Sequence, residues 1–214
     1  MPIDEPARNC ALCPRLAEFR RANKLAWPQW HNAPVPSFGP VNTSLLIVGL
    51  APGLRGANRT GRPFTGDYAG DLLYPTIAEF GFGKGMFEAR PDDGFQMTGC
   101  RITNAVRCVP PENKPTTVEI NSCNPFLTAE IKGQKNLRAI LALGLIAHKA
   151  VLRSLGLVAA RYTFGHGAMH ELPGGLLLAD SYHCSRYNTN TGRLTEAMFH
   201  AVFAELRERL TKKD

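Results

Sequence analysis

Four short apolar runs alternate along the chain with segments whose apolar residues recur at helical spacing. The runs cover residues 44–49, 100–106, 137–143 and 176–181. Nearly continuous apolar runs are typical of parallel strands that are covered on both faces. Helices are expected over about 15–24, 71–80, 116–132, 145–155 and 194–210. Strands that alternate with helices predict a three-layer α/β/α fold around a central, mostly parallel four-stranded sheet.

Residues 1–43 precede the first predicted strand and are interpreted as an N-terminal arm. Cys10 and Cys13 lie near its start, and a predicted helix follows them. The prolines between Trp27 and Pro40 disfavour regular structure there. A chain of 214 residues suits one hydrophobic core, so we expect a single domain over 1–214 that includes this arm.

Unusual residues follow three of the predicted strands. The loop Gly49–Asp67 leaves the first strand, Asn104 ends the second, and His183 follows the fourth. Parallel sheets place their sites beyond the carboxyl ends of the strands, so we expect one shared site. The loop holds five glycines and three arginines, which favour close approach to an anionic ligand. It lacks the Gly-Lys-Ser/Thr ending of a P-loop and the Gly-x-Gly-x-x-Gly dinucleotide fingerprint.

Composition and charge narrow the classes of protein. Hydrophobic residues make up 44% and charged residues 20%, which excludes a disordered or fibrous chain. Twenty-five basic residues against 18 acidic ones give a net charge of +7, which favours a polyanionic partner such as nucleic acid or reflects ordinary solubility charge. No apolar run reaches the ~20 residues of a membrane span, and the start lacks a signal-peptide pattern. We expect a cytoplasmic protein without a membrane partner.

The cysteines form a recognisable metal-binding pattern. Cys10 and Cys13 are separated by two residues, and Cys108 and Cys123 lie far along the chain. Four such thiolates suit either zinc or an iron–sulfur cluster, and the spacing does not choose between them. Four unconnected buried thiols are the alternative interpretation.

Three blocks of sequence, together with these four cysteines, resemble one known family. The blocks are 49–53 continuing to 61–67, 103–111, and 183–193. They read Gly-Leu-Ala-Pro-Gly with Gly-Arg-Pro-Phe-Thr-Gly-Asp, then Thr-Asn-Ala-Val-Arg-Cys-Val-Pro-Pro, then His-Cys-Ser-Arg-Tyr-Asn-Thr-Asn-Thr-Gly-Arg. Over nearly its whole length the chain resembles the uracil-DNA glycosylase superfamily, and within it the iron–sulfur enzymes of family 5.

The resemblance implies roles for the residues of these blocks. A base that has left the DNA stack needs an aromatic floor, matched by Phe64, and a polar group for its edge, matched by Asn104. His183 matches the donor toward the base oxygen, and Asp67 matches the carboxylate that positions water and offsets the sugar cation. Further base-binding positions are Ala51, Gly53 and Asn188. Without the family, we would favour Asn104 as a cap of the following turn and Phe64 as a core residue.

The resemblance also implies the cofactor and the DNA contacts. It favours a structural [4Fe-4S] cluster on Cys10, Cys13, Cys108 and Cys123, fastening the arm to the loop after the second strand. Tyr187 stands where related enzymes wedge a side chain into the duplex. Candidate phosphate contacts are Arg55, Arg59, Arg62, Arg186 and Arg193, for which a solvated rim is the alternative.

The family pattern is not matched everywhere. Leu50 and Ala51 are apolar where related families carry an acidic residue or Asn, which implies a less selective pocket that tolerates deaminated purines. Cys184 replaces the usual proline of the His183 block.

The expected function is that of a monomeric, monofunctional DNA repair glycosylase. It would hydrolyse uracil, and other deaminated bases such as hypoxanthine or xanthine, from DNA and leave an abasic site. No lysine lies in the three blocks to form a Schiff base. The alternatives are an iron–sulfur protein that binds damaged DNA without catalysis, and an iron–sulfur redox protein. The sequence leaves the base preference and the choice between single and double strands open.

Overall fold

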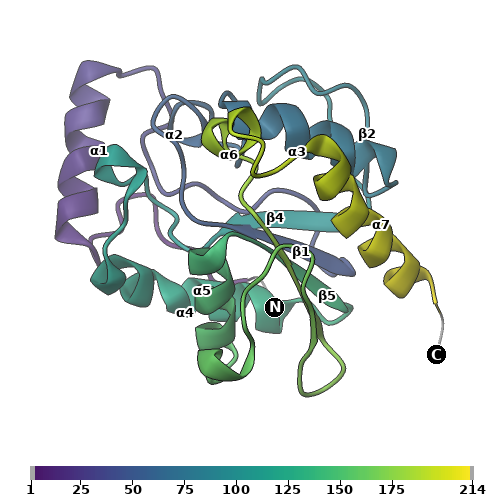
Figure 1. Ribbon diagram of the computed structural model, residues 1–214. Coiled ribbons are helices and arrows are strands. Elements are labelled where there is room, and N and C mark those ends of the chain that lie inside the picture. The colour runs from purple at the N-terminus through teal and green to yellow at the C-terminus, as the bar shows by residue number, and fades with distance from the viewer. Residues whose placement is uncertain (1–2, 213–214) are drawn as a thin grey trace.

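A computed structural model of the protein describes residues 3–212. Its centre is a five-stranded sheet in the order β4-β1-β5-β7-β6 (Figure 1). Its strands are β1 (Leu45–Gly49), β4 (Cys100–Asn104), β5 (Ala139–Leu143), β6 (Met169–Glu171) and β7 (Leu177–Ser181). β1 pairs in parallel with β4 and β5, and β5 pairs in parallel with β7. The carboxyl ends of these four strands therefore meet at one edge.

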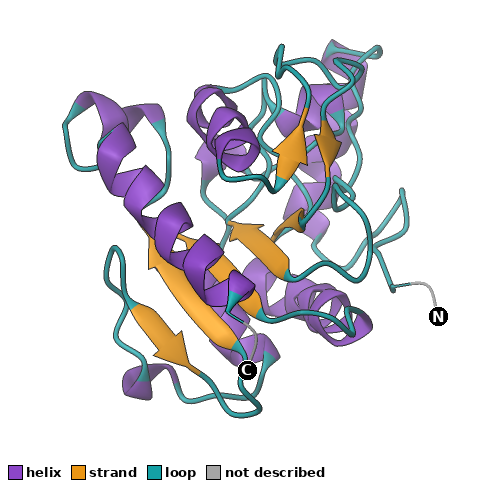
Figure 2. Cartoon of the chain, turned by 90° about the vertical axis from the view of Figure 1, so that its right-hand side faces the viewer, coloured by secondary structure: helices purple, strands orange, loops and turns teal. Residues whose placement is uncertain are grey.

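Helices cover both faces of the sheet, as Figure 2 shows. Alternating residues of β1 divide between two cores: Leu45 and Ile47 face one side, and Leu46 and Val48 the other. The first core is completed by α3 (Tyr68–Glu79) and α7 (Glu196–Thr211), and the second by α4 (Thr117–Gly133) and α5 (Leu145–Ser154). The predicted three-layer α/β fold is confirmed.

The remaining elements are short, apart from α1 with its 13 residues. They are α1 (Pro14–Ala26), α2 (Ala57–Thr60), α6 (Arg186–Asn190), the 3-10 helices η1 (Pro111–Asn113) and η2 (Ala159–Arg161), and the strand pair β2 (Gly83–Lys84) and β3 (Gln96–Met97). The capping box of Thr116 and Glu119 is present at the start of α4. No helix among residues 3–212 is long and apolar enough to cross a membrane.

The sheet has one strand more than the four that the sequence predicts. β6 pairs antiparallel with β7 at the sheet edge and has only three residues. Its sequence, Met-His-Glu, is partly exposed, so it lacks the apolar run that marks the buried strands. His170 of β6 and His148 of α5 each contact one oxygen of buried Asp180 on β7, at 3.1 and 2.7 Å. This network holds the edge strand against the sheet.

The N-terminal arm packs against the end of the domain that carries α4. Leu16 of α1 lies in a small apolar cluster with Val106, Cys108 and Cys123. Arg15 forms a bidentate ion pair with Glu119, with both N–O distances at 2.7 Å. The Pro-rich stretch has no strand or helix, apart from a bridge between Phe38 and Ile102 of β4. The arm is thus joined to β4 and α4.

Candidate active site

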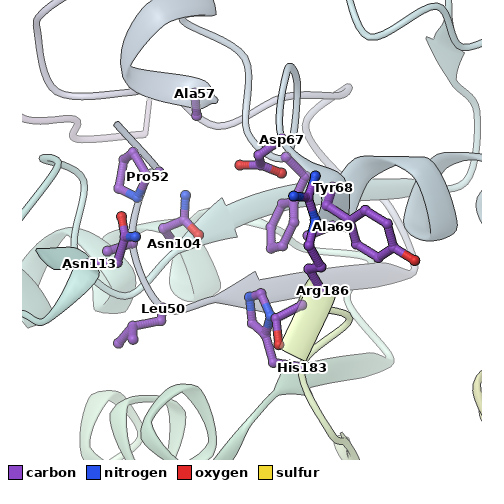
Figure 3. Close-up of a pocket in the computed structure, with 14 residues that line it drawn as sticks. Leu50, Pro52, Ala57, Asp67, Tyr68, Ala69, Asn104, Asn113, His183 and Arg186 are labelled. Carbon is purple, nitrogen blue, oxygen red and sulfur yellow. The ribbon is translucent and has the colours of Figure 1, made fainter. Parts of the chain in front are cut away.

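A cavity of about 320 Å³ opens at the carboxyl ends of the parallel strands. Figure 3 shows Asp67, Asn104 and His183 arranged around it, although they lie far apart in the sequence. They come from the start of α3, the end of β4 and the segment after β7. The cavity is lined by Leu50, Ala51, Pro52, Gly53, Ala57, Phe64, Asp67, Tyr68, Ala69, Asn104, Asn113, His183, Ser185 and Arg186. The expected convergence of the three strand ends on one site is therefore present.

The Phe64 ring forms one wall of the cavity. Its centroid lies 5.8 Å from that of the His183 ring, with 29° between the planes. A Cβ atom at Gly49 would lie 2.5 Å from both the Phe64 ring and Asn104 Oδ1. Glycine at the end of β1 is therefore required for the ring and the amide to approach the same strand end.

The Phe64 backbone is held in an unfavourable conformation by its neighbours. Its φ is 53°, in the left-handed region that non-glycine residues rarely adopt. The Tyr74 hydroxyl donates to the carbonyl oxygen of the preceding Pro63 at 2.7 Å. Buried Arg62 forms a bidentate ion pair with Asp93 at 2.8 and 2.7 Å. Such a strained backbone persists where surrounding contacts fix it, as is common at functional sites.

The position of Arg62 corrects one sequence-based expectation. Arg62 is only 5% exposed, and its guanidinium lies about 5 Å from the ring centroids of Phe38 and Tyr74. Because it is buried and paired with Asp93, it is not available to a DNA phosphate. The loop's other two arginines, Arg55 and Arg59, are exposed.

Asp67 presents a largely buried carboxylate to the cavity. It is the N-cap residue of α3, but its side chain closes no cap hydrogen bond. Within the described part of the chain, its Oδ1 atom is buried and has no hydrogen-bond partner. Burial raises the pKa of the Asp67 carboxyl, while the N–H groups of Gly70 and Ala69 oppose that shift. A Cβ at Gly56 would lie 2.2 Å from Asp67 Oδ2, so glycine there leaves room for the carboxylate.

Asn104 offers a side-chain amide with unused hydrogen-bonding capacity. It is 3% exposed, and its Oδ1 atom is buried without a partner among residues 3–212. Buried amide groups are usually paired, so an unpaired one that lines a cavity is suited to a ligand.

His183 is held in its position through its backbone. The Asn188 side chain donates to the His183 carbonyl oxygen at 2.8 Å, and Asn188 does not line the cavity. The Asn188 side chain thus supports the His183 backbone, and its base-binding role stays a prediction. Burial lowers the pKa of His183 to about 4, so its ring is neutral at neutral pH.

The other predicted binding residues fall into two groups. Ala51 and Gly53 line the cavity, as does Arg186, whose guanidinium lies 5.1 Å from the Tyr68 ring centroid. Outside the cavity, Tyr187 is 71% exposed on α6. Arg193 lies over the Tyr182 ring at 4.6 Å and is exposed.

Sequence reasoning missed Asn113 and Tyr68 as cavity residues. Asn113 belongs to η1, between Cys108 and Cys123, and its φ is 57°. Exposed Asn in a left-handed conformation after two prolines resembles an ordinary turn, so only the fold reveals that it faces the cavity. Tyr68 follows Asp67 directly, just after the matched block and before the helix predicted from residue 71, so neither pattern marked it.

The four predicted metal ligands lie around a second, smaller cavity. Cys10, Cys13, Cys108 and Cys123 all line it. Cys13 is the N-cap residue of α1, Cys108 follows β4, and Cys123 lies in α4. Arg20 binds the carbonyl oxygens of Arg8 (3.0 Å) and Cys10, which shapes the Cys10–Cys13 turn. Among residues 3–212, no three of the four sulfur atoms lie within 4.8 Å of one another.

Comparison with known proteins places this fold and site in a family. The model of the uracil DNA glycosylase superfamily matches residues 36–207. Type-5 uracil-DNA glycosylases of Thermus thermophilus and Mycobacterium leprae are 46% and 42% identical to the chain over 202 and 208 residues. The aligned parts cover 92% and 93% of this chain, and 91% and 90% of those proteins. A type-4 uracil-DNA glycosylase of Pyrobaculum aerophilum is 36% identical over 155 residues, 72% of this chain and 65% of that protein.

The chain therefore belongs to the uracil-DNA glycosylase superfamily, and within that superfamily to the type-5 group.

Proposed function

We propose that this protein hydrolyses the N-glycosidic bond of uracil in DNA and leaves an abasic site. The observation that carries the proposal is the convergence of Phe64, Asn104, His183 and Asp67 on one cavity. The type-5 relatives carry uracil-DNA glycosylase as their name. A cavity of about 320 Å³ is large enough for one extruded base, and such enzymes act on a base outside the stack.

The cavity can bind a pyrimidine through shape and through its polar edge. The Phe64 ring offers a flat surface for stacking. The Asn104 amide offers a donor and an acceptor, and its Oδ1 is available to the N3–H group of uracil. The base edge would thereby satisfy a buried polar group that is otherwise unpaired, which favours binding.

Cleavage moves negative charge onto the base and positive charge onto the sugar. Burial lowers the pKa of His183 to about 4, so its ring is neutral at neutral pH. The one N–H group of the neutral ring can donate a hydrogen bond to the base oxygen as negative charge develops there. The Asp67 carboxylate is the acidic group that lines the cavity. Its negative charge stabilises the sugar cation, and its free oxygen can orient water for attack.

The wall of the cavity supports action on other deaminated bases. Leu50, Ala51 and Pro52 line the cavity with apolar groups. Apolar groups at these positions make no hydrogen bond that would reject a larger base, so discrimination there rests on shape alone. We therefore include hypoxanthine and xanthine among the substrates.

The absence of an amine nucleophile supports a monofunctional reaction. Among the described residues, those that line the cavity include no lysine. Without an amine to form a Schiff base with the sugar, the reaction ends at the abasic site and the strand is not cut.

We also propose that Cys10, Cys13, Cys108 and Cys123 hold a [4Fe-4S] cluster. The four cysteines line one small cavity, which supports a single shared metal centre. The resemblance to the iron–sulfur enzymes of family 5 favours a cluster over a zinc ion. Hydrolysis needs no electron transfer, so the cluster would serve as a structural link between the arm, the β4 loop and α4.

The second candidate function is recognition of damaged DNA without cleavage. The exposed arginines and Tyr187 would serve either function. The buried Asp67 carboxylate favours the enzyme, because an unpaired anion at the base pocket weakens the binding of a polyanion.

A panel of oligonucleotides tests these proposals together. Each duplex or single strand carries one uracil, hypoxanthine, xanthine or oxidised pyrimidine, and the cluster-loaded protein is assayed for free base and for abasic sites. We expect release of uracil, hypoxanthine and xanthine, with strand breaks only after alkali. Tight, salt-sensitive binding without any released base would establish the binding protein instead. Strand breaks without alkali would contradict the monofunctional reaction.

A further inference from the structure

A further hollow borders the loop that follows β1. It is lined by Trp27, Trp30, Arg55, Arg59 and Gly66. Gly66 directly precedes Asp67, which lines the base cavity. The same loop thus contributes residues to both the base cavity and this hollow, and the two tryptophans follow α1 directly. Neither tryptophan belongs to the site described above.

The two tryptophans form a flat platform. Their ring centroids lie 4.4 Å apart with 8° between the planes, so the rings are stacked. Trp27 is 38% exposed, which leaves apolar ring surface at the hollow open to solvent. An exposed ring that is already held parallel to a second ring presents the kind of surface on which nucleobases stack.

Hydrogen bonds fix this platform relative to the loop. The buried Asn32 side chain donates to the carbonyl oxygens of Trp27 and Trp30, at 2.8 and 3.3 Å. Asn58 of α2 donates to Asn32 Oδ1 at 3.0 Å, and its carbonyl oxygen accepts from the Asn32 N–H. The platform and the loop therefore form one preorganised unit, which reduces the entropic cost of binding a ligand between them.

The hollow also carries positive charge from two arginines that line it with the tryptophans. Arg55 and Arg59 are both exposed, and Arg59 is oriented by a 2.8 Å hydrogen bond from its Nε to the Arg55 carbonyl oxygen. Within residues 3–212, neither guanidinium forms an ion pair with a carboxylate. An aromatic surface that faces two unpaired arginines matches a nucleotide, which has a flat base and an anionic phosphate.

We infer that this hollow binds a nucleotide of the DNA strand that flanks the excised base. The inference rests on the proposed function and deepens it. The flanking base stacks on Trp27, and its phosphate lies against Arg55 and Arg59. This contact fixes the strand on both sides of the loop that carries Asp67, so it contributes to substrate affinity and not to the cleavage step.

The protein's composition provides a direct reporter, because Trp27 and Trp30 are its two tryptophans. Cluster-loaded protein is titrated with a duplex that carries a stable abasic analogue, and tryptophan fluorescence is recorded. We expect a saturable change in emission with the same midpoint as binding measured by DNA anisotropy. Unchanged emission while the same DNA binds would overturn the inference.

Variants separate stacking from charge. Trp27→Ala should weaken binding roughly 5- to 100-fold, since stacking on an aromatic ring is worth about 1–3 kcal/mol per base. Its single-turnover rate at saturating enzyme should stay within about twofold of wild type, and Trp27→Phe should restore most of the affinity. The logarithm of the binding constant falls linearly with the logarithm of the salt concentration, and Arg55→Ala should make this slope shallower by the amount that corresponds to about one phosphate contact. The matched controls are Leu25→Ala and Arg153→Ala, which should bind DNA as wild type does. Leu25 is apolar, 85% exposed and outside the hollow, and Arg153 is exposed on α5.

Shortened DNA distinguishes a nucleotide contact from a structural role. Duplexes that end just 5′ or just 3′ of the lesion are compared for wild type and Trp27→Ala. The affinity difference should vanish on one of the two. A difference that persists on both, or is absent on the full duplex, would overturn the inference. If wild-type protein released no uracil from any duplex, the proposed function would fail instead.

Discussion

Asp67 is the residue whose removal should slow the reaction most. Its carboxylate lines the cavity and its Oδ1 is unpaired, so an amide would keep the shape but lose the negative charge opposite the sugar cation. We expect Asp67→Asn to lower the single-turnover rate of uracil release about 10²- to 10⁴-fold, with less than a tenfold change in DNA affinity. Rapid-quench assays with excess enzyme measure the rate, and anisotropy measures binding. A variant with the wild-type rate would exclude the assigned role.

The pH dependence of the reaction follows from the two buried titratable groups. Burial raises the pKa of Asp67 above its ordinary value and lowers that of His183 to about 4. Both groups have their active form, carboxylate and neutral imidazole, on the alkaline side of these values. We expect the single-turnover rate to fall toward acidic pH as the Asp67 carboxylate takes up its proton, with no contribution from His183 near pH 6.5, the ordinary value for histidine. A step near pH 6.5 that persists in Asp67→Asn would show that His183 titrates normally.

The limits of sequence-based prediction are clear from single residues. The approach of Asn104 to His183 is predictable because each ends or follows a parallel strand, whereas the roles of Phe64 and Asn104 in base binding rest on the family resemblance. Arg62 lies in the same glycine-rich loop as Arg55, yet it is buried because Asp93, 31 residues further on, pairs with it. That partner lies in a segment between β2 and β3 that has no apolar pattern, so the sequence gives no sign of the pair.

At the scale of elements, the ion pair of Arg62 and Asp93 holds the loop of the base cavity. Both side chains are buried, and removing one partner leaves the other charge unpaired. Asp93→Ala should lower the free energy of unfolding by about 3–5 kcal/mol. The exposed pair of Glu88 and Arg90 is the matched control, and Glu88→Ala should cost less than about 1 kcal/mol. Urea unfolding measures the free energy of unfolding of both variants. Equal losses of stability would show that the buried ion pair stabilises the fold no more than the exposed one does.

The Asp93 pair also predicts how stability depends on pH. The Arg62 guanidinium holds the pKa of Asp93 well below its ordinary value. The unfolded chain therefore takes up a proton first as the pH falls, so this contribution is present above about pH 4 and is lost in more acidic solution. In Asp93→Ala the loss of stability between about pH 5 and pH 3 should be smaller than in wild type. An equal loss in both proteins would contradict the assignment.

The proposed cluster would cross-link two helices that also meet at the Arg15–Glu119 ion pair and in the apolar cluster of Leu16. Cys13 caps α1 and Cys123 lies in α4, so a shared cluster would act as a cross-link between them. We expect Cys123→Ser to lose its iron and its visible absorbance, and to be less stable by about 2–4 kcal/mol, as for a cross-link of similar span. Cys100→Ala, at a core thiol outside the set, should retain iron. Full iron content in Cys123→Ser would contradict the ligand assignment.

The long elements are predictable and the short ones are not. The four parallel strands and five helices were expected close to their observed bounds, because apolar runs and helical spacing mark elements that are buried. β6 and α6 lie at the surface, where packing imposes no pattern. α6 nevertheless carries Arg186 and Tyr187, so part of the proposed DNA-binding surface depends on an element that the sequence did not predict.

At the scale of the whole molecule, the fold brings separate parts of the chain to the carboxyl edge of one sheet. The loop after β1 supplies Phe64 and Asp67, β4 supplies Asn104, and the segment after β7 supplies His183. The exposed arginines lie on this loop and on α6, and the chain as a whole carries a net charge of +7. The base cavity and its positive surroundings are thus properties of the assembled domain, since no single segment contains them.

A crystal structure with DNA tests the central claim most directly. The duplex would carry one 2′-fluoro-2′-deoxyuridine, whose fluorine destabilises the sugar cation and slows cleavage. We predict that the uracil lies outside the stack in the cavity, with its face on Phe64, its edge on Asn104 and its oxygen facing His183. A bound duplex in which the uracil stays stacked in the helix, or lies in a different pocket, would contradict this account.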